Sequence, residues 1–178
     1  GGTGNDTYII RDEAEIVELW NEGIDTVISD RSWRLGYNLE RLVLSSAAGH
    51  AEAIGNVLDN YLIGNAGNNT LDGRGGQNTL EGGAGNDTYS VYHSGDRVIE
   101  AAGGGTDRID AYANHTLFAH SSVEFIYAMG SAGRSLTGNS LANQFFSNAA
   151  RADTLTGGSG NDIYHLRHTG DRVIERAG

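Results

Sequence analysis

The chain has 178 residues, of which 38% are hydrophobic, and it contains no cysteine. This length and composition suffice for a folded core, while the lack of cysteine excludes a disulfide framework and a thiolate metal site. The formal charge of −11 argues against nucleic acid and anionic membrane surfaces as partners, and it favours cations.

The 27 glycines and the absence of proline indicate a backbone that needs glycine at repeated positions. No stretch approaches the ~20 apolar residues of a membrane-spanning helix, and the N-terminus lacks the pattern of a signal peptide. Because the chain begins inside a repeat unit and stops just after another, we expect it to be a piece of a longer protein.

The first segment, residues 1–54, begins with the glycine-rich phrase GGTGNDTYI and continues as a longer spacer with β patterns. In this spacer, IDTVIS (24–29) alternates with a period of two and LERLVL (39–44) contains a short apolar run. Both are therefore predicted strands. The stretch DEAEIVELW (12–20) is the one segment whose pattern admits an amphipathic helix.

Residues 55–90 divide without remainder into four nonamers, GNVLDNYLI, GNAGNNTLD, GRGGQNTLE and GGAGNDTYS. Each nonamer has glycine first, Asp or Asn sixth and an apolar residue eighth. One apolar residue per nine, next to β-compatible Thr or Tyr and after a glycine-rich turn, predicts a short strand and a turn that stack in a solenoid.

The second half of the chain repeats this organisation at an offset of 82 − 1 = 81 residues. A second spacer (91–137) leads into a degenerate block of three rows (138–165), which carries one extra residue at Ser147 and ends in GGSGNDIYH; residues 166–178 then start a third spacer. We therefore predict an all-β fold, a parallel β-roll or β-solenoid that runs continuously through all five segments.

The aspartate at the sixth position and the glycines before it together suit a calcium site. Stacked turns bring equivalent carboxylates together, and like charges repel unless a cation lies between them. Calcium suits such a place because it takes six to eight hard oxygen ligands in a flexible arrangement. Glycine allows the turn to adopt positive φ and to offer its carbonyl oxygens.

At this point the sequence resembles the RTX (repeats in toxin) family of calcium-binding nonapeptide repeats, with the pattern GGxGxDxUx. The phrases at residues 1, 82 and 157 match every specified position if Tyr is accepted as U. The resemblance implies a roll in which two nonamers make one turn, with calcium between turns i and i+2. The turn of Asp87 would then face the turn of Asn69, and Asn78 would face Asn60.

The resemblance also implies a secreted bacterial protein, export by a type I secretion system, and folding triggered by calcium outside the cell. The candidate calcium-binding residues are the aspartates and glycines of the intact motifs, the spacer carboxylates as second ligands, one facing asparagine and one degenerate row: Asp6, Asp87, Asp162, Gly1, Gly4, Gly82, Gly85, Gly157, Gly160, Asp25, Asp107, Asn69 and Asp153.

Four rows depart from the motif because asparagine stands sixth, at Asn60, Asn69, Asn78 and Asn143. An asparagine offers one neutral oxygen, so these rows are predicted to be structural more than metal-binding, and a ladder of amides bonded along the stack would replace calcium there. The row of Asp153 has lost its glycines. Tyr8, Tyr89 and Tyr164, at the eighth position, are predicted core residues.

The sequence contains no GxSxG element and no nucleophile beside an evident base, so we predict no enzyme within these residues. The histidine pairs His115/His120 and His165/His168 lack the spacing of a zinc helix. The alternative function is a polysaccharide- or surface-binding segment of an adhesin, or the calcium module attached to a secreted epimerase, lipase or metalloprotease. Trp20 and Trp33 would be the candidate sugar-stacking residues.

Overall fold

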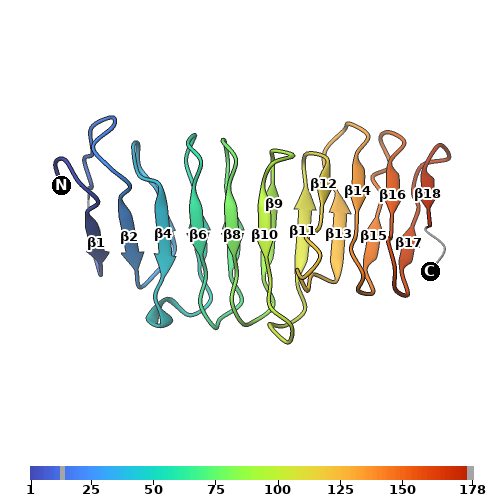
Figure 1. Ribbon diagram of the computed structural model, residues 1–178, viewed down its shortest axis with the longest axis horizontal. Coiled ribbons are helices and arrows are strands. Elements are labelled where there is room, and N and C mark those ends of the chain that lie inside the picture. The colour runs from blue at the N-terminus through green and yellow to red at the C-terminus, as the bar shows by residue number, and fades with distance from the viewer. Residues whose placement is uncertain (13–14, 176–178) are drawn as a thin grey trace.

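A computed structural model describes residues 1–12 and 15–175. The chain winds as an elongated solenoid in which strands follow one another along the long axis, with the N-terminus at one end and the C-terminus at the other (Figure 1). Within the described residues the one helix is the short 3₁₀ helix η1 (Ser46–Ala48). No helix there is long and apolar enough to cross a bilayer.

The strands form three parallel sheets. The six-stranded sheet contains, in order, β1 (Thr7–Ile10), β2 (Thr26–Ser29), β4 (Arg41–Leu44), β6 (Tyr61–Ile63), β8 (Thr79–Glu81) and β10 (Arg97–Ile99). The eight-stranded sheet contains β17 (Ile163–His165), β15 (Gln144–Phe146), β13 (Phe125–Ala128), β11 (Arg108–Ala111), β9 (Thr88–Val91), β7 (Thr70–Asp72), β5 (Glu52–Ile54) and β3 (Trp33–Arg34). The four-stranded sheet contains β12 (His115–Thr116), β14 (Ser135–Thr137), β16 (Thr154–Thr156) and β18 (Arg172–Ile174).

Each predicted nonamer forms a turn followed by a strand over its last three positions. The eighth residue points into the solenoid, so that Leu62, Leu71, Leu80 and Tyr89 are completely buried. Neighbours in one sheet are two rows apart, as in Leu62↔Leu80 and Leu71↔Tyr89. The predicted parallel β-roll with two nonamers per coil is therefore confirmed.

The degenerate block continues the roll. Its rows give β15, β16 and β17, with Phe145 and Leu155 fully buried at the eighth position. The extra residue, Ser147, is accommodated between two strands, where its hydroxyl donates to Asp171 Oδ2 at 2.6 Å and accepts from the Arg167 N–H at 2.7 Å. A one-residue insertion therefore stays in the turn and leaves the register of the strands unchanged.

The stretch that admitted a helix forms none where it is described. Residues 15–19 have no regular structure, and residues 13–14 lie outside the described part of the chain. Ile16 packs against the core and Glu18 is buried, whereas Val17 and Leu19 are exposed. The segment therefore alternates as an extended chain does, and the two predicted strands that follow it, β2 and β4, do form.

The number of rows decides on which face a repeated element lies, because one row makes half a coil. β1 and β2 belong to the six-stranded sheet, but their equivalents in the second repeat, β9 and β11, belong to the eight-stranded sheet. Four rows separate the first spacer from the second. The degenerate block has three, and β17, the next equivalent of β9, stays in the eight-stranded sheet. One row more or fewer thus moves an element to the opposite face.

Candidate metal centres

The residues that directly precede the strands form ladders along the solenoid. In several of these residues a side-chain oxygen accepts the backbone N–H of the equivalent residue one coil earlier, as in Asn69 N–H to Asp87 Oδ1 (2.6 Å) and Asn60 N–H to Asn78 Oδ1 (2.9 Å). The predicted facing of Asp87 with Asn69, and of Asn78 with Asn60, is therefore confirmed. The ladder joins side chain to backbone, and not amide to amide as the sequence suggested.

In the asparagine rows the second side-chain atom also has a partner. Asn60 Nδ2 donates to the Leu39 carbonyl oxygen at 3.0 Å, Asn69 Nδ2 to that of Gly49 at 3.0 Å, and Asn143 Nδ2 to that of Val123 at 2.7 Å. The amide oxygens meanwhile close their own turns, because each accepts an N–H four residues earlier. These rows are saturated by hydrogen bonds from the protein itself.

In the aspartate rows that retain the full motif, the second oxygen has no partner. Oδ2 of Asp6, Asp87 and Asp162 is buried and accepts no hydrogen bond. A carboxylate oxygen cannot donate, so the carbonyl groups that satisfy an asparagine amide offer it nothing. A buried charged oxygen in this state is costly unless a cation binds it.

Two spacer carboxylates join Asp87. One ligand oxygen from each of Asp87, Glu100 and Asp107 lies within 4.8 Å of the others, and all three side chains are buried. Asp107 Oδ2 has no partner either. Burial, with the neighbouring carboxylates, raises the pKa of Glu100 to about 7 and that of Asp107 to about 6. The cluster therefore resists carrying its full negative charge alone.

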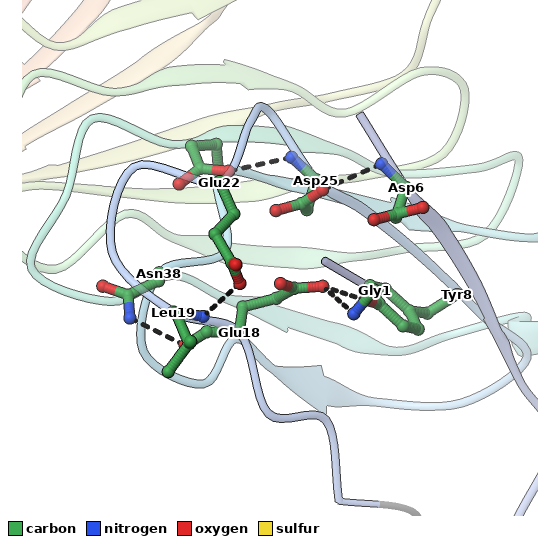
Figure 2. A network of polar contacts seen from close by, with 9 residues as sticks. Gly1, Asp6, Tyr8, Glu18, Leu19, Glu22, Asp25 and Asn38 are labelled. Carbon is green, nitrogen blue, oxygen red and sulfur yellow. Dashed lines mark hydrogen bonds and ion pairs between the residues drawn. The ribbon is translucent and has the colours of Figure 1, made fainter. Parts of the chain in front are cut away.

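The first repeat contains the equivalent cluster. The carboxylates of Asp6, Glu18 and Asp25 turn toward a common space (Figure 2), with one oxygen of each within 4.8 Å of the others. Oε2 of Glu18 is buried without a partner, while its Oε1 accepts from the Gly1 nitrogen at 2.7 Å and from the Tyr8 hydroxyl. The two clusters lie in different ladders because β1 and β9 occupy opposite faces.

Each eighth-position tyrosine of the intact motifs donates to a spacer glutamate, and two of these glutamates belong to the clusters. The hydroxyl of Tyr89 donates to Glu100, that of Tyr8 to Glu18 and that of Tyr164 to Glu175. Tyr89 is a core residue, as predicted, with no exposed surface. Its hydroxyl nevertheless gives it a second role, because it fixes one oxygen of a candidate ligand.

The motif glycines act in two ways. Gly83 and Gly85 have φ of +102° and +105°, so the turn does need positive φ. Gly82, by contrast, provides space, because a Cβ there would overlap the Tyr89 hydroxyl and Asp87 Oδ2. Gly1 and Gly157 make the same room for Asp6 and Asp162, while Gly4 and Gly160 repeat the positive φ of Gly85.

The remaining predicted ligands lie outside the two clusters. Asp162 keeps its unpartnered oxygen and lies near Glu175, but no third carboxylate joins them in the described residues. Asp153 Oδ1 accepts from the Arg134 N–H at 2.6 Å and Oδ2 accepts from the Asn148 N–H at 2.7 Å. Asn69 is saturated. The geometry therefore favours Asp6, Asp25, Asp87 and Asp107, and it leaves Asp153 and Asn69 as structural groups.

The two glutamates were missed by sequence reasoning, although a signal exists. A Tyr two residues after the motif aspartate is followed by a glutamate at an almost constant distance, which gives Asp6/Tyr8/Glu18, Asp87/Tyr89/Glu100 and Asp162/Tyr164/Glu175. Neither three-carboxylate group contains a histidine. The donor set is thus entirely hard oxygen, as calcium prefers and zinc does not.

Comparison with known protein families identifies the nonamer rows as a known type of repeat. The family model of the RTX calcium-binding nonapeptide repeat matches four copies, over residues 54–89 and 149–166. The comparisons with curated proteins and with solved structures gave no match. The matched residues are those that stack as rows of the parallel solenoid, with carboxylates and amides in the turns. Residues 54–89 and 149–166 are therefore RTX calcium-binding nonapeptide repeats, and they form rows of the β-roll.

Proposed function

We propose that this chain is a structural module of a secreted bacterial protein, exported by a type I system, whose order outside the cell depends on calcium. The observation that carries the proposal is the set of buried carboxylate oxygens without a partner at Asp6, Asp87 and Asp162. Asp6 and Asp87 each belong to a three-carboxylate group, and the family's repeat is a calcium-binding one.

Calcium supplies positive charge to carboxylates that otherwise repel one another inside the solenoid. Extracellular calcium modules bind at ~10⁻⁴ to 10⁻³ M, so the sites would be empty inside a cell and filled outside it. At free calcium about tenfold above Kd, each site stabilises the fold by roughly 1.4 kcal/mol. The module is then less stable before export and more stable after it. The proposal assigns the chain no catalytic step.

A calcium titration of EDTA-treated protein tests this function, followed by far-UV circular dichroism with calorimetry on the same sample. We expect β-structure to increase, and unfolding in urea to shift to higher concentration, with a few ions bound per chain. Magnesium at the same ionic strength is the control. A spectrum that is already β-rich, with no calcium heat and no shift in the urea midpoint, would contradict the proposal.

A second candidate function is binding of an acidic polysaccharide. A surface hollow of about 620 Å³ is lined by Tyr37, Arg34 and Arg74 among others, and Tyr37 is 83% exposed. Planar aromatic and guanidinium groups beside a groove suit an anionic sugar chain. A glycan array with and without calcium tests it, and loss of a positive signal in Tyr37→Ala would locate the surface.

A further inference from the structure

At two places along the solenoid, successive coils are joined by strand pairing on one face, while within the described residues the opposite face has no strand pairing between them. β1 pairs with β2, but the segment 15–19 that follows β1 forms no strand, and β3 pairs with β5 alone in the described residues. β9 likewise pairs with β11, while β10 ends the six-stranded sheet and β12 begins the four-stranded one. Both breaks fall in spacers, where the backbone ladder is missing from one side.

A surface hollow marks each break. One, of about 360 Å³, is lined by Glu18, Trp33 and neighbouring residues; the other, of about 270 Å³, is lined by Glu100, Phe118 and neighbouring residues. Few hydrogen bonds cross these places. The Ser122 N–H donates to the Glu100 carbonyl oxygen at 3.1 Å, and Asn38 Nδ2 donates to that of Glu18 at 2.8 Å. The spacer segments that contain Glu18 and Glu100 are therefore joined to the next coil by few backbone hydrogen bonds.

At each of these two places, the coils that pair on one face only contain one of the carboxylate clusters. Asp87 and Glu100 begin and end one coil, and Asp107 begins the next, so the cluster spans the junction. Asp6, Glu18 and Asp25 have the same arrangement in the first spacer. Four oxygens in the two clusters are buried without a partner: Asp6 Oδ2, Glu18 Oε2, Asp87 Oδ2 and Asp107 Oδ2.

We propose that the spacers complete the metal centres, so that a calcium ion held by a motif aspartate, a spacer glutamate and a spacer aspartate fastens together two coils that the backbone joins on one face only. This inference rests on the proposed calcium-binding function and extends it from the nonamers to the spacers. The ion binds carboxylates from both coils, and this link takes the place of the strand pairing that the spacer lacks. Each full spacer thus contributes one composite site.

The residues favour a divalent ion bound by oxygen. Three carboxylates supply up to six oxygens, which suits the coordination number of calcium. Their combined charge of −3 exceeds the +2 charge of the ion, so the ion offsets most of the repulsion among the three carboxylates. In both clusters the glutamate accepts from a tyrosine hydroxyl, and the spacer aspartate accepts a backbone N–H through Oδ1.

The test compares two glutamates that both accept a hydrogen bond from a tyrosine hydroxyl. Glu100 accepts from Tyr89 inside the cluster, and Glu81 accepts from Tyr61 outside it. In calorimetric calcium titrations of the whole chain, Glu100→Gln should weaken one class of site by roughly tenfold or more, and Glu81→Gln should leave the isotherm unchanged. Hydrogen exchange adds a second readout, since calcium should protect residues 97–123 in the wild type and in Glu81→Gln but not in Glu100→Gln.

The outcomes separate this inference from the proposed function. If the wild type binds calcium and Glu100→Gln has the same isotherm and the same protection, the spacer is not a ligand and the inference is wrong, while the module remains calcium-dependent. If the wild type itself shows no calcium heat, the proposed function fails first. Should Glu100→Gln not fold, Glu18→Gln tests the equivalent cluster in the same way, and an unchanged isotherm there would also overturn the inference.

Discussion

The asparagine rows and the carboxylate clusters occupy equivalent turns of the same roll, yet their buried polar side-chain atoms differ in whether they find a partner within the protein. Asn60 uses its Nδ2 as a donor to a carbonyl of the preceding coil, and Asn69 does the same. Asp87 offers an oxygen at the corresponding place, and that oxygen has no partner. An amide thus finds its partners within the protein, whereas the carboxylate leaves one buried charged oxygen without a partner.

The comparison implies that stability is distributed unevenly along the solenoid. Rows with asparagine at residues 60, 69 and 78 lie between the two clusters, and their amide nitrogens donate to carbonyl oxygens of the chain itself. The spacer junctions have three carboxylates each, and under the proposed function they depend on calcium. Local unfolding should therefore begin at the junctions when calcium is removed.

The largest expected effect comes from converting an asparagine row into an aspartate row. Asn60→Asp removes the donor to the carbonyl oxygens of Leu39 and Glu40 and places a charge at a residue that is 3% exposed. We expect a loss of about 3 kcal/mol of unfolding free energy in EDTA, measured by urea denaturation.

The matched control is Asn68→Asp in the same block, because Asn68 is exposed and uses its oxygen as an acceptor, which aspartate retains. Its expected change is near zero. If Asn60→Asp and Asn68→Asp lower the unfolding free energy in EDTA equally, the hydrogen bonds of the Asn60 side chain do not stabilise the turn in the absence of metal.

The next effect is a dependence of the calcium-free protein on pH. The folded-state pKa of Glu100 is raised by burial to about 7 and that of Asp107 to about 6, so between about pH 4 and 7 the folded state binds more protons than the unfolded chain. Stability in EDTA should therefore fall as pH rises through this range, by about 2 kcal/mol.

Denaturation in EDTA at several pH values measures this slope, with Glu100→Gln as the comparison. The variant has one carboxyl fewer in the cluster, so its curve should be flatter over the same range. A wild-type curve that instead rises with pH between 5 and 7 would show that the cluster is not strained by its own charge.

A smaller effect of opposite sign follows from neutralising one member of a cluster. Asp107 is completely buried beside Asp87 and Glu100. Asp107→Asn should raise the unfolding temperature in EDTA, by the equivalent of about 1 kcal/mol, because it removes one of three like charges. It should also narrow the gap between the melting curves with calcium and with EDTA.

Asp59→Asn makes the same charge change at an exposed side chain whose oxygen accepts from the Gln77 N–H, a bond that asparagine preserves. It should leave both curves in place. Equal shifts in the two variants would mean that net charge, and not the cluster, sets the calcium-free stability.

The sequence predicted the rows because one buried residue in nine fixes both the turn and the strand. It also named Asp25 and Asp107 as second ligands beside the motif aspartates, and the structure brings both into the three-carboxylate groups. It missed Glu18 and Glu100 because they come from a segment without row periodicity, whose path depends on how the spacer packs. It expected every motif glycine to serve the backbone, whereas Gly82 makes room for a carboxylate and a phenol.

Asp153 also stands sixth in its row, but both of its carboxylate oxygens accept hydrogen bonds from the protein. Its row has Asn148 in place of the first glycine, and the Asn148 N–H and Nδ2 both donate to the carboxylate. Which turn surrounds an aspartate therefore decides whether its oxygens remain free, and this depends on side-chain positions that a repeat pattern does not specify.

The smallest expected effect isolates the tyrosine that links core and cluster. Tyr89→Phe retains the buried ring but removes the hydroxyl that donates to Glu100. Because this hydroxyl positions a ligand and is not itself one of the three carboxylates, calcium affinity should fall only a few-fold while unfolding free energy in EDTA changes by less than about 1 kcal/mol. Tyr61→Phe removes a comparable bond to Glu81 on the outer face, and should leave the calcium titration unchanged. A calcium affinity equally insensitive to both substitutions would mean that the carboxylates alone define the centre, and that tyrosine at the eighth position of the intact motif serves only to fill the core.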